Sequence, residues 1–137
     1  MFKNFNTEQN AELCRLLEEK AYHKNEVIVQ EGDSDRSLFL VYSGNARIVK
    51  LNDYGEEIDI AYLDSGSYFG ELSLIDNQPR SASIIALEQC VCYKLSPISY
   101  TQFCRQFPEA MALILRGFLL DVISKVRNTN EDYIRYH

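Results

Sequence analysis

Short apolar segments separated by regularly spaced turns occupy the middle of this chain, from about Ala21 to Leu95. The turns recur about every ten residues. Four of them contain a glycine, which adopts a left-handed backbone at little cost. Such a succession is typical of an antiparallel sandwich or barrel. The strands expected on this basis are Val27–Val29, Leu38–Tyr42, Ala46–Leu51, Ile58–Leu63, Ala82–Leu87 and Val91–Leu95.

Helical patterns flank this region on both sides. Apolar residues at helical spacing, preceded by an Asn6–Gln9 capping box, predict a helix over about residues 7–20. Ser96 as N-cap and Pro97 at the first helical position predict a helix over about 97–106, and Pro108 opens a longer one over about 108–128. The expected architecture is a single domain, residues 1–137, mainly β with flanking helices.

The long C-terminal helix is predicted to carry more apolar surface than a single narrow stripe. Its apolar residues form two neighbouring stripes: Leu115, Leu119, Val122 and Val126 in one, and Met111, Ile114 and Phe118 in the other. They indicate either two apolar faces, one for the β region and one for a partner, or one broad buried face. Both interpretations stay open at this point.

Charge and composition argue against several classes of protein. The net charge is −6 and basic residues are scattered, whereas a surface that binds nucleic acid is basic. A metal enzyme built on a β-barrel needs clustered histidines with a carboxylate, but the chain has only His23 and His137. Nothing pairs a cysteine with a base that would activate it. We therefore expect no enzymatic activity, no metal and no cofactor.

The cysteines and the apolar stretches indicate in which cellular compartment the protein is located. The chain has four cysteines, Cys14, Cys90, Cys92 and Cys104, and none of them form a C-x-x-C pair. They are expected to be mostly buried thiols in a reducing cytosol. The N-terminus lacks the apolar core of a signal peptide. The stretch Ala110–Val126 is broken by three charged residues, so we expect no membrane insertion and a cytoplasmic location.

One segment, Tyr68–Ser83, departs from the strand pattern. A glycine, Gly70, precedes a short helical turn, a polar loop follows, and Pro79-Arg80 leads into the next strand. The first N–H groups of a helix lack intrahelical partners and attract negative charge. The planar guanidinium of Arg80 matches two phosphate oxygens. These residues predict an anion site, with Glu71 beside it as an acceptor for a sugar hydroxyl.

Residues 69–83, with Phe69-Gly70-Glu71-Leu72-Ser73-Leu74 and Arg80-Ser81-Ala82-Ser83, resemble the phosphate-binding cassette of cyclic-nucleotide-binding domains. The turns at Glu31-Gly32-Asp33 and Ser43-Gly44 are also similar to that family, and the resemblance covers about 21–127. It implies an antiparallel, jelly-roll-like β-roll with an N-terminal helix, a short cassette helix and two C-terminal helices.

The resemblance also implies a role for each matching residue of the cassette. Gly70 and Glu71 would contact the ribose, with the Glu71 carboxylate accepting from the 2′-hydroxyl. The backbone N–H groups of Leu72 and Ser73 would face the cyclic phosphate, and Arg80 would pair with its charge. Two further groups follow in the chain, the hydroxyl of Ser81 and the backbone N–H of Ala82.

Residues outside the cassette would face the base. Three of them match positions inside the roll that are core residues in any case: Ile48, Ile60 and Leu63. Three more lie on the long helix, at the level where relatives cover the base, although the covering residue differs among them: Asp121, Ser124 and Lys125.

The function implied is that of a regulatory sensor, with cyclic AMP favoured over cyclic GMP and with ligand binding coupled to movement of the C-terminal helix. The long helix would also suit a homodimer. Because the chain ends at His137, without a helix-turn-helix segment, we expect no direct DNA binding. Two alternatives remain: a structural or protein-docking module that binds no ligand, and a regulatory domain cut from a transporter, channel or signalling protein.

Overall fold

The computed structural model describes residues 5–136, and for Lys125 and residues 128–136 it describes the backbone alone. The described chain divides into two compact units. One is the β-rich segment Leu16–Tyr100, and the other combines the N-terminal segment up to Arg15 with the segment from Thr101 onward. The expectation of a single domain over residues 1–137 stays a prediction.

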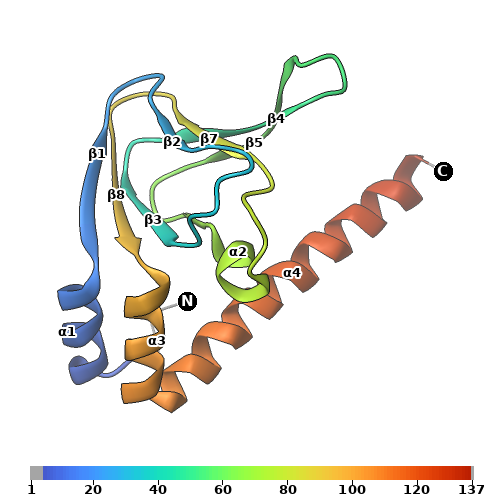
Figure 1. Ribbon diagram of the computed structural model, residues 1–137. Helices are drawn as coiled ribbons and strands as arrows, with labels where there is room; N and C mark the ends of the chain where they lie inside the picture. The colour runs from blue at the N-terminus through green and yellow to red at the C-terminus, as the bar shows by residue number, and fades with distance from the viewer. Residues whose placement is uncertain (1–4, 137) are drawn as a thin grey trace. The chain divides into compact units, whose positions relative to one another are not determined.

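The β-rich unit contains two four-stranded antiparallel sheets (Figure 1). The first has the strand order β1-β8-β3-β6 and the second β2-β7-β4-β5. The strands are β1 (Glu18–Tyr22), β2 (Val27–Val29), β3 (Leu38–Ser43), β4 (Ala46–Leu51), β5 (Glu57–Leu63), β6 (Tyr68–Phe69), β7 (Ser83–Ala86) and β8 (Cys90–Leu95). The short helix α2 (Glu71–Asp76) lies between β6 and β7 in the chain. This arrangement confirms the predicted mainly β fold of the β-roll type.

The core of this unit is formed by inward-facing residues of both sheets, because side chains alternate between the faces of a strand. Phe39 and Phe69 are members of this core and stack on each other, with ring centroids 4.9 Å apart. Apolar burial of this kind provides most of the stability of a small sheet protein. The other buried members are Val29, Val41, Ala46, Ile84, Ala86, Cys90 and Cys92.

Two strands were not predicted, and one of them shortens a predicted helix. The helix α1 (Thr7–Leu16) ends before residue 20, because Glu18–Tyr22 forms β1 and pairs with β8 from Glu18↔Lys94 to Tyr22↔Cys90. Glu18, Glu19 and Lys20 are good helix formers, so backbone pairing with a neighbouring strand overrides their local preference here. The second, β6, has only two residues and pairs with Phe39 and Leu40.

The helical unit consists of α1, most of α3 (Pro97–Gln106) and α4 (Pro108–Tyr136). The capping box is confirmed, since Asn6 and Gln9 exchange backbone-to-side-chain hydrogen bonds of 3.0 and 2.8 Å. At the start of α3 the Ser96 hydroxyl accepts from the Ser99 N–H at 3.2 Å, as expected of an N-cap. Buried apolar residues of this unit include Phe5, Leu13, Phe103, Phe107, Ala110, Ile114 and Phe118.

The helix α4 continues to Tyr136, beyond the predicted end near residue 128, and neither glycine nor proline interrupts it after Gly117. Its two apolar stripes differ in part: Ile114 and Phe118 of one are buried, whereas Leu119, Val122 and Val126 of the other are exposed. Met111 is also exposed, and Leu115 is half-buried. Within the described residues, none of the helices is both long and apolar enough to span a membrane.

Candidate functional site

The predicted helical turn of the cassette is confirmed as α2, which directly follows β6. Gly70 at its N-cap has φ of 90°, a left-handed conformation that favours glycine. The first intrahelical bond in this turn runs from the Leu74 N–H to the Gly70 carbonyl. The N–H groups of Glu71, Leu72 and Ser73 precede that bond. They belong to the first turn of the helix, where N–H donors have no intrahelical acceptor.

Arg80 is attached by its backbone to the loop that follows β2. Its N–H donates to the Asp33 carbonyl at 2.9 Å, and its carbonyl accepts from the Gly32 N–H at 2.9 Å. The Glu31-Gly32-Asp33 turn singled out in the sequence therefore fixes the backbone position of Arg80. This pairing explains how two segments nearly fifty residues apart form one site.

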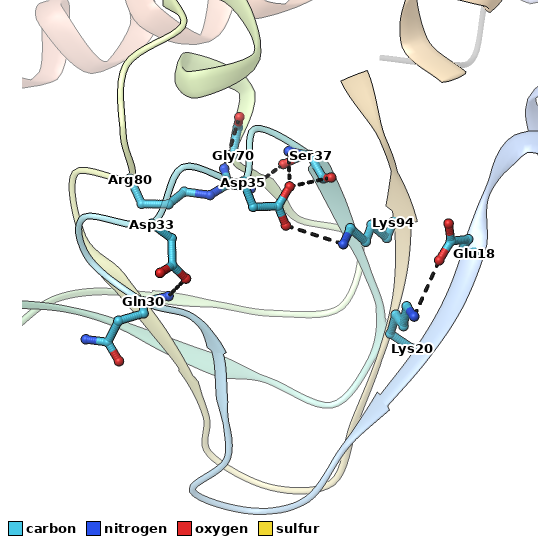
Figure 2. Close-up of polar contacts among 9 residues, drawn as sticks. All are labelled: Glu18, Lys20, Gln30, Asp33, Asp35, Ser37, Gly70, Arg80 and Lys94. Atoms are coloured by element: carbon cyan, nitrogen blue, oxygen red, sulfur yellow. Dashed lines mark hydrogen bonds and ion pairs between the residues drawn. The ribbon is translucent and has the colours of Figure 1, made fainter. Parts of the chain in front are cut away.

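The guanidinium group of Arg80 is buried, and the residue is only 5% exposed. Its Nη2 donates to the Ser37 carbonyl at 2.6 Å, and its Nη1 donates to the Gly70 carbonyl at 3.3 Å (Figure 2). Its Cζ lies 5.8 Å from the centroid of the Phe39 ring. The buried Nε has no acceptor within the described part of the chain. Arg80 is thus a buried cation with spare hydrogen-bonding capacity.

The electrostatic surroundings of Arg80 are unfavourable for a buried charge. Burial lowers the pKa of Arg80, and the carboxylates of Asp35, Asp33 and Glu71 only partly oppose that effect. None of the hydrogen bonds observed for the guanidinium goes to a carboxylate. A buried charge without a bonded counter-ion is costly. An anion that reached this group would therefore be stabilised strongly.

Gly70 is required here for space as well as for its backbone angle. A Cβ atom added to Gly70 would lie 2.5 Å from the Ser37 carbonyl oxygen and in collision with Nη1 of Arg80. The guanidinium, the carbonyl of Ser37 and the backbone of Gly70 therefore pack together without room for a side chain. The N-terminus of α2 and the guanidinium group of Arg80 are therefore in direct contact.

The remaining cassette residues differ in their exposure to solvent. Ser73 is buried, Glu71 and Ala82 are half-buried, and Leu72 and Ser81 are exposed. The structure therefore brings together Gly70, α2 and Arg80. The ligand contacts expected of all seven cassette residues, Gly70, Glu71, Leu72, Ser73, Arg80, Ser81 and Ala82, stay predictions.

The residues expected to face the base fall into two groups. Ile48 and Leu63 pack against the core of the β-roll, as predicted. Ile60 was expected to be a core residue, and this is wrong: it is 56% exposed. The pairing of β4 with β5 shifts between Ile48↔Ala61 and Val49↔Asp59, which leaves Ile60 without a cross-strand partner in an edge strand. Edge position and bulge together keep it out of the core.

The predicted base contacts of the long helix lie on α4, in the helical unit. Asp121 and Ser124 are exposed, and the side chain of Lys125 lies outside the described residues. Their role as base contacts stays a prediction.

Sequence reasoning missed Ser37, whose carbonyl accepts a hydrogen bond from Arg80, and Asp35, which bonds to Ser37. The Ser37 acceptor is a carbonyl oxygen, which every residue type provides, so no sequence signal marks it. Asp35 accepts from the Ser37 N–H at 3.0 Å and from its hydroxyl at 2.7 Å. The Asp-x-Ser spacing is a signal for such a local turn. Asp35 also pairs with Lys94 of β8 at 3.3 Å.

The described residues contain no cluster of three or more histidine, cysteine, aspartate or glutamate side chains that could hold a metal ion. All four cysteines are thiols, with Cys14 exposed and the other three buried. The Sγ atoms of Cys90 and Cys92 lie 3.8 Å apart on one face of β8. Burial raises the pKa of the Cys92 thiol to about 12, so it is protonated at neutral pH.

Comparison with known proteins places these observations in a family context. Residues 19–107 match the family model described as "Cyclic nucleotide-binding domain". The chain is 33% identical over 124 residues to a cAMP-dependent protein kinase regulatory subunit of Blastocladiella emersonii, a match that covers 90% of this chain and 27% of that relative. It is 34% identical over 92 residues to a cyclic AMP receptor protein of Thermus thermophilus, with 67% of this chain and 43% of that relative covered.

A solved structure agrees over the full length of the chain. The crystal structure of a cyclic nucleotide-binding domain from Methylobacillus flagellatus has a TM-score of 0.86 at 25% identity, covering 100% of this chain and 77% of that one. The two curated relatives are much longer, since this chain spans 27% of one and 43% of the other.

Proposed function

Because this chain belongs to the cyclic nucleotide-binding domain family, as the match over residues 19–107 shows, we propose that it is a regulatory sensor that binds cyclic AMP. One observation carries the proposal: among the described residues, the buried guanidinium of Arg80 has no acceptor for its Nε and no hydrogen bond to a carboxylate. A cyclic phosphate bears the single negative charge and the exocyclic oxygens that such a group recognises.

The phosphate would bind between α2 and Arg80. The bond from Nη1 to the Gly70 carbonyl is 3.3 Å long, beyond the usual range for N–H donors, so it is the easier of the two to exchange for a phosphate oxygen. The short bond from Nη2 to Ser37 would hold the guanidinium in place meanwhile. The N–H groups of Leu72 and Ser73 would complete the phosphate contacts, with Ser81 and Ala82 at the loop before β7.

The rest of the nucleotide would follow from this anchor. Glu71 directly follows Gly70 and would accept from the ribose 2′-hydroxyl. Ile48, Ile60 and Leu63 would pack against the base. The exposure of Ile60 fits this role better than a core position would, since an apolar ligand surface would cover it. Asp121, Ser124 and Lys125 of α4 would contribute from the helical unit.

Cyclic AMP is preferred over cyclic GMP in this proposal because the two curated relatives are named for cyclic AMP. Calorimetric titration of the chain with cyclic AMP, cyclic GMP and adenosine tests it. Adenosine is the matched control because it lacks the phosphate. Stronger binding of cyclic AMP than of cyclic GMP, with no binding of adenosine, is the expected result. Binding of none of the three would favour the ligand-free docking module instead.

The output of binding would be transmitted through the C-terminal helices. A ligand shifts a conformational equilibrium only by the difference in its affinity for the two states. The exposed residues Leu119, Val122 and Val126 of α4 form an apolar stripe, and we extend the proposal to a homodimer formed through it. The chain would act without catalysis, in the cytoplasm, where its exposed thiol Cys14 stays reduced.

A further inference from the structure

Two cations share the ring of Phe39 in the β-rich unit. Lys94 Nζ and Arg80 Cζ each lie 5.8 Å from the centroid of that ring. Lys94 pairs directly with Phe39 in the antiparallel register of β3 and β8, and its side chain is only 26% exposed. A half-buried lysine near a buried arginine brings two positive charges close together, and their repulsion is unfavourable. Lys94 is therefore expected to have a specific role at this position.

The carboxylate of Asp35 is paired with one of these two cations, Lys94, and not with Arg80. Its Oδ2 pairs with Lys94 at 3.3 Å, and its Oδ1 accepts both the N–H and the hydroxyl of Ser37 (Figure 2). Of the three carboxylates that act on the charge of Arg80, Asp35 has the largest effect. Its oxygens are nevertheless bonded to Lys94 and Ser37, while Arg80 bonds to carbonyl oxygens.

We propose that Lys94 is a positioning residue of the phosphate site, which holds Asp35 in a pair of its own and so keeps this carboxylate from neutralising Arg80. The inference rests on the function proposed above, because its consequence is the affinity of Arg80 for a phosphate. An arginine paired with an internal carboxylate presents a closed site, and the ligand must first break that pair. With Lys94 in place, the charge of Arg80 stays available.

The consequence is measurable as a change in apparent affinity. Without Lys94, Oδ2 of Asp35 loses its ion-pair partner, and we expect this carboxylate to turn toward Arg80, on whose charge it already acts. If the resulting pair forms in nine chains of ten, the competent fraction falls to about one tenth and the Kd for cyclic AMP rises about tenfold. Removing Asp35 as well removes the competitor, so the affinity of the double variant returns toward that of the wild type.

The experiment is a calorimetric titration of the full chain with cyclic AMP, using Lys94→Met, Asp35→Asn and the double variant. Lys20→Met is the matched control, because Lys20 also pairs with a carboxylate, Glu18 at 3.4 Å, and loses the same charge at an exposed site. We expect a rise in Kd of about tenfold for Lys94→Met alone. A loss of affinity that Asp35→Asn does not rescue would mean that Lys94 acts by its own charge, and would overturn the inference.

A second measurement separates this inference from the proposed function. The NMR resonance of the Arg80 Nε–H group in the unliganded chain reports its bonding directly. It should shift in Lys94→Met, and shift back in the double variant. An unchanged resonance in Lys94→Met would refute the inference. If the wild type binds no cyclic AMP, the proposed function fails, and this resonance still decides whether Lys94 keeps Asp35 from Arg80.

Discussion

Arg80 and Ser37 are 43 positions apart in the sequence, yet Nη2 of Arg80 donates to the carbonyl of Ser37 at 2.6 Å in the buried interior of the β-roll. This contact ties the segment after α2 to the start of β3. It holds a charged group in position before any ligand arrives. Preorganisation of this kind reduces the cost of binding, because the side chain has already lost its rotational freedom.

The first prediction concerns Gly70. Gly70→Ala should lower the melting temperature and abolish cyclic AMP binding, because its Cβ would collide with Nη1 of Arg80 and press on the Ser37 carbonyl. Gly55→Ala is the matched control, since Gly55 also has a positive φ, of 78°, but open space around its Cβ. The control carries only the backbone strain, about 1–2 kcal/mol. Equal melting temperatures and equal affinities for the two variants would contradict the packing described here.

The second prediction concerns the thiols. At pH 8 the native chain should react rapidly with a disulfide reagent at one thiol, that of the exposed Cys14. Burial hinders access to Cys90 and Cys92 and raises the pKa of both, to about 12 for Cys92. Spectroscopic titration should count one fast thiol in the native chain and four in denaturant. Rapid modification of Cys90 or Cys92 in the native chain would show that the core of the β-roll is open, whereas modification of the buried Cys104 would concern the helical unit.

The sequence was sufficient for most of the β-roll because turn residues and apolar alternation set its strands. β2 and β4 have the bounds that were predicted for them. The sequence was insufficient for β1, because its residues Glu18–Lys20 favour a helix locally and form a strand only through pairing with β8. The partner that decides this lies more than seventy positions away, and local propensity contains no information about it.

The site shows the same division between local and distant information. Gly70 and Arg80 were identifiable because their residue types match an anion site, and the turn of α2 lies next to them in the chain. The carbonyl of Ser37 and the pair of Asp35 with Lys94 could not be found in this way, since they depend on the register of β3 with β8. The exposure of Ile60 likewise depends on a bulge that its sequence does not mark.

The third prediction concerns pH. Burial acts to raise the pKa of Asp35, but bonds from Ser37 and the nearby Lys94 outweigh it, so the pKa in the folded chain lies below the usual value. A lowered pKa means that Asp35 stabilises the fold above the unfolded pKa, near 4, and that this contribution is lost as the pH falls through the folded value. Urea unfolding should therefore show Asp35→Asn to be less stable than wild type at pH 7.

The same experiment at pH 3 should show a smaller difference between Asp35→Asn and the wild type, because the wild-type carboxyl is then being protonated. Asp53→Asn, at an exposed turn, provides the control for a change of net charge. A destabilisation by Asp35→Asn that is constant from pH 7 to pH 3 would argue against the ionised pair as its origin.

The fourth prediction concerns the exposed stripe of α4. Light scattering of the chain should give twice the monomer mass, and Leu119→Glu should reduce it to the monomer by placing a charge in an apolar interface. Ile98→Glu is the control, since Ile98 is 73% exposed at the start of α3 and outside the stripe. A monomeric wild type, with and without cyclic AMP, would refute the homodimer.

The most direct test of the phosphate site is calorimetric titration of Arg80→Ala with cyclic AMP beside the wild type. Losing one partner of a buried charged pair costs about 2–5 kcal/mol, which corresponds to a loss of affinity of roughly 30-fold to several thousand-fold. Arg47→Ala, which removes an arginine bonded to Asp59 on the exposed β4–β5 hairpin, should bind as the wild type does. Equal affinity of Arg80→Ala and the wild type would contradict the account, because the ligand's charge would then be held elsewhere.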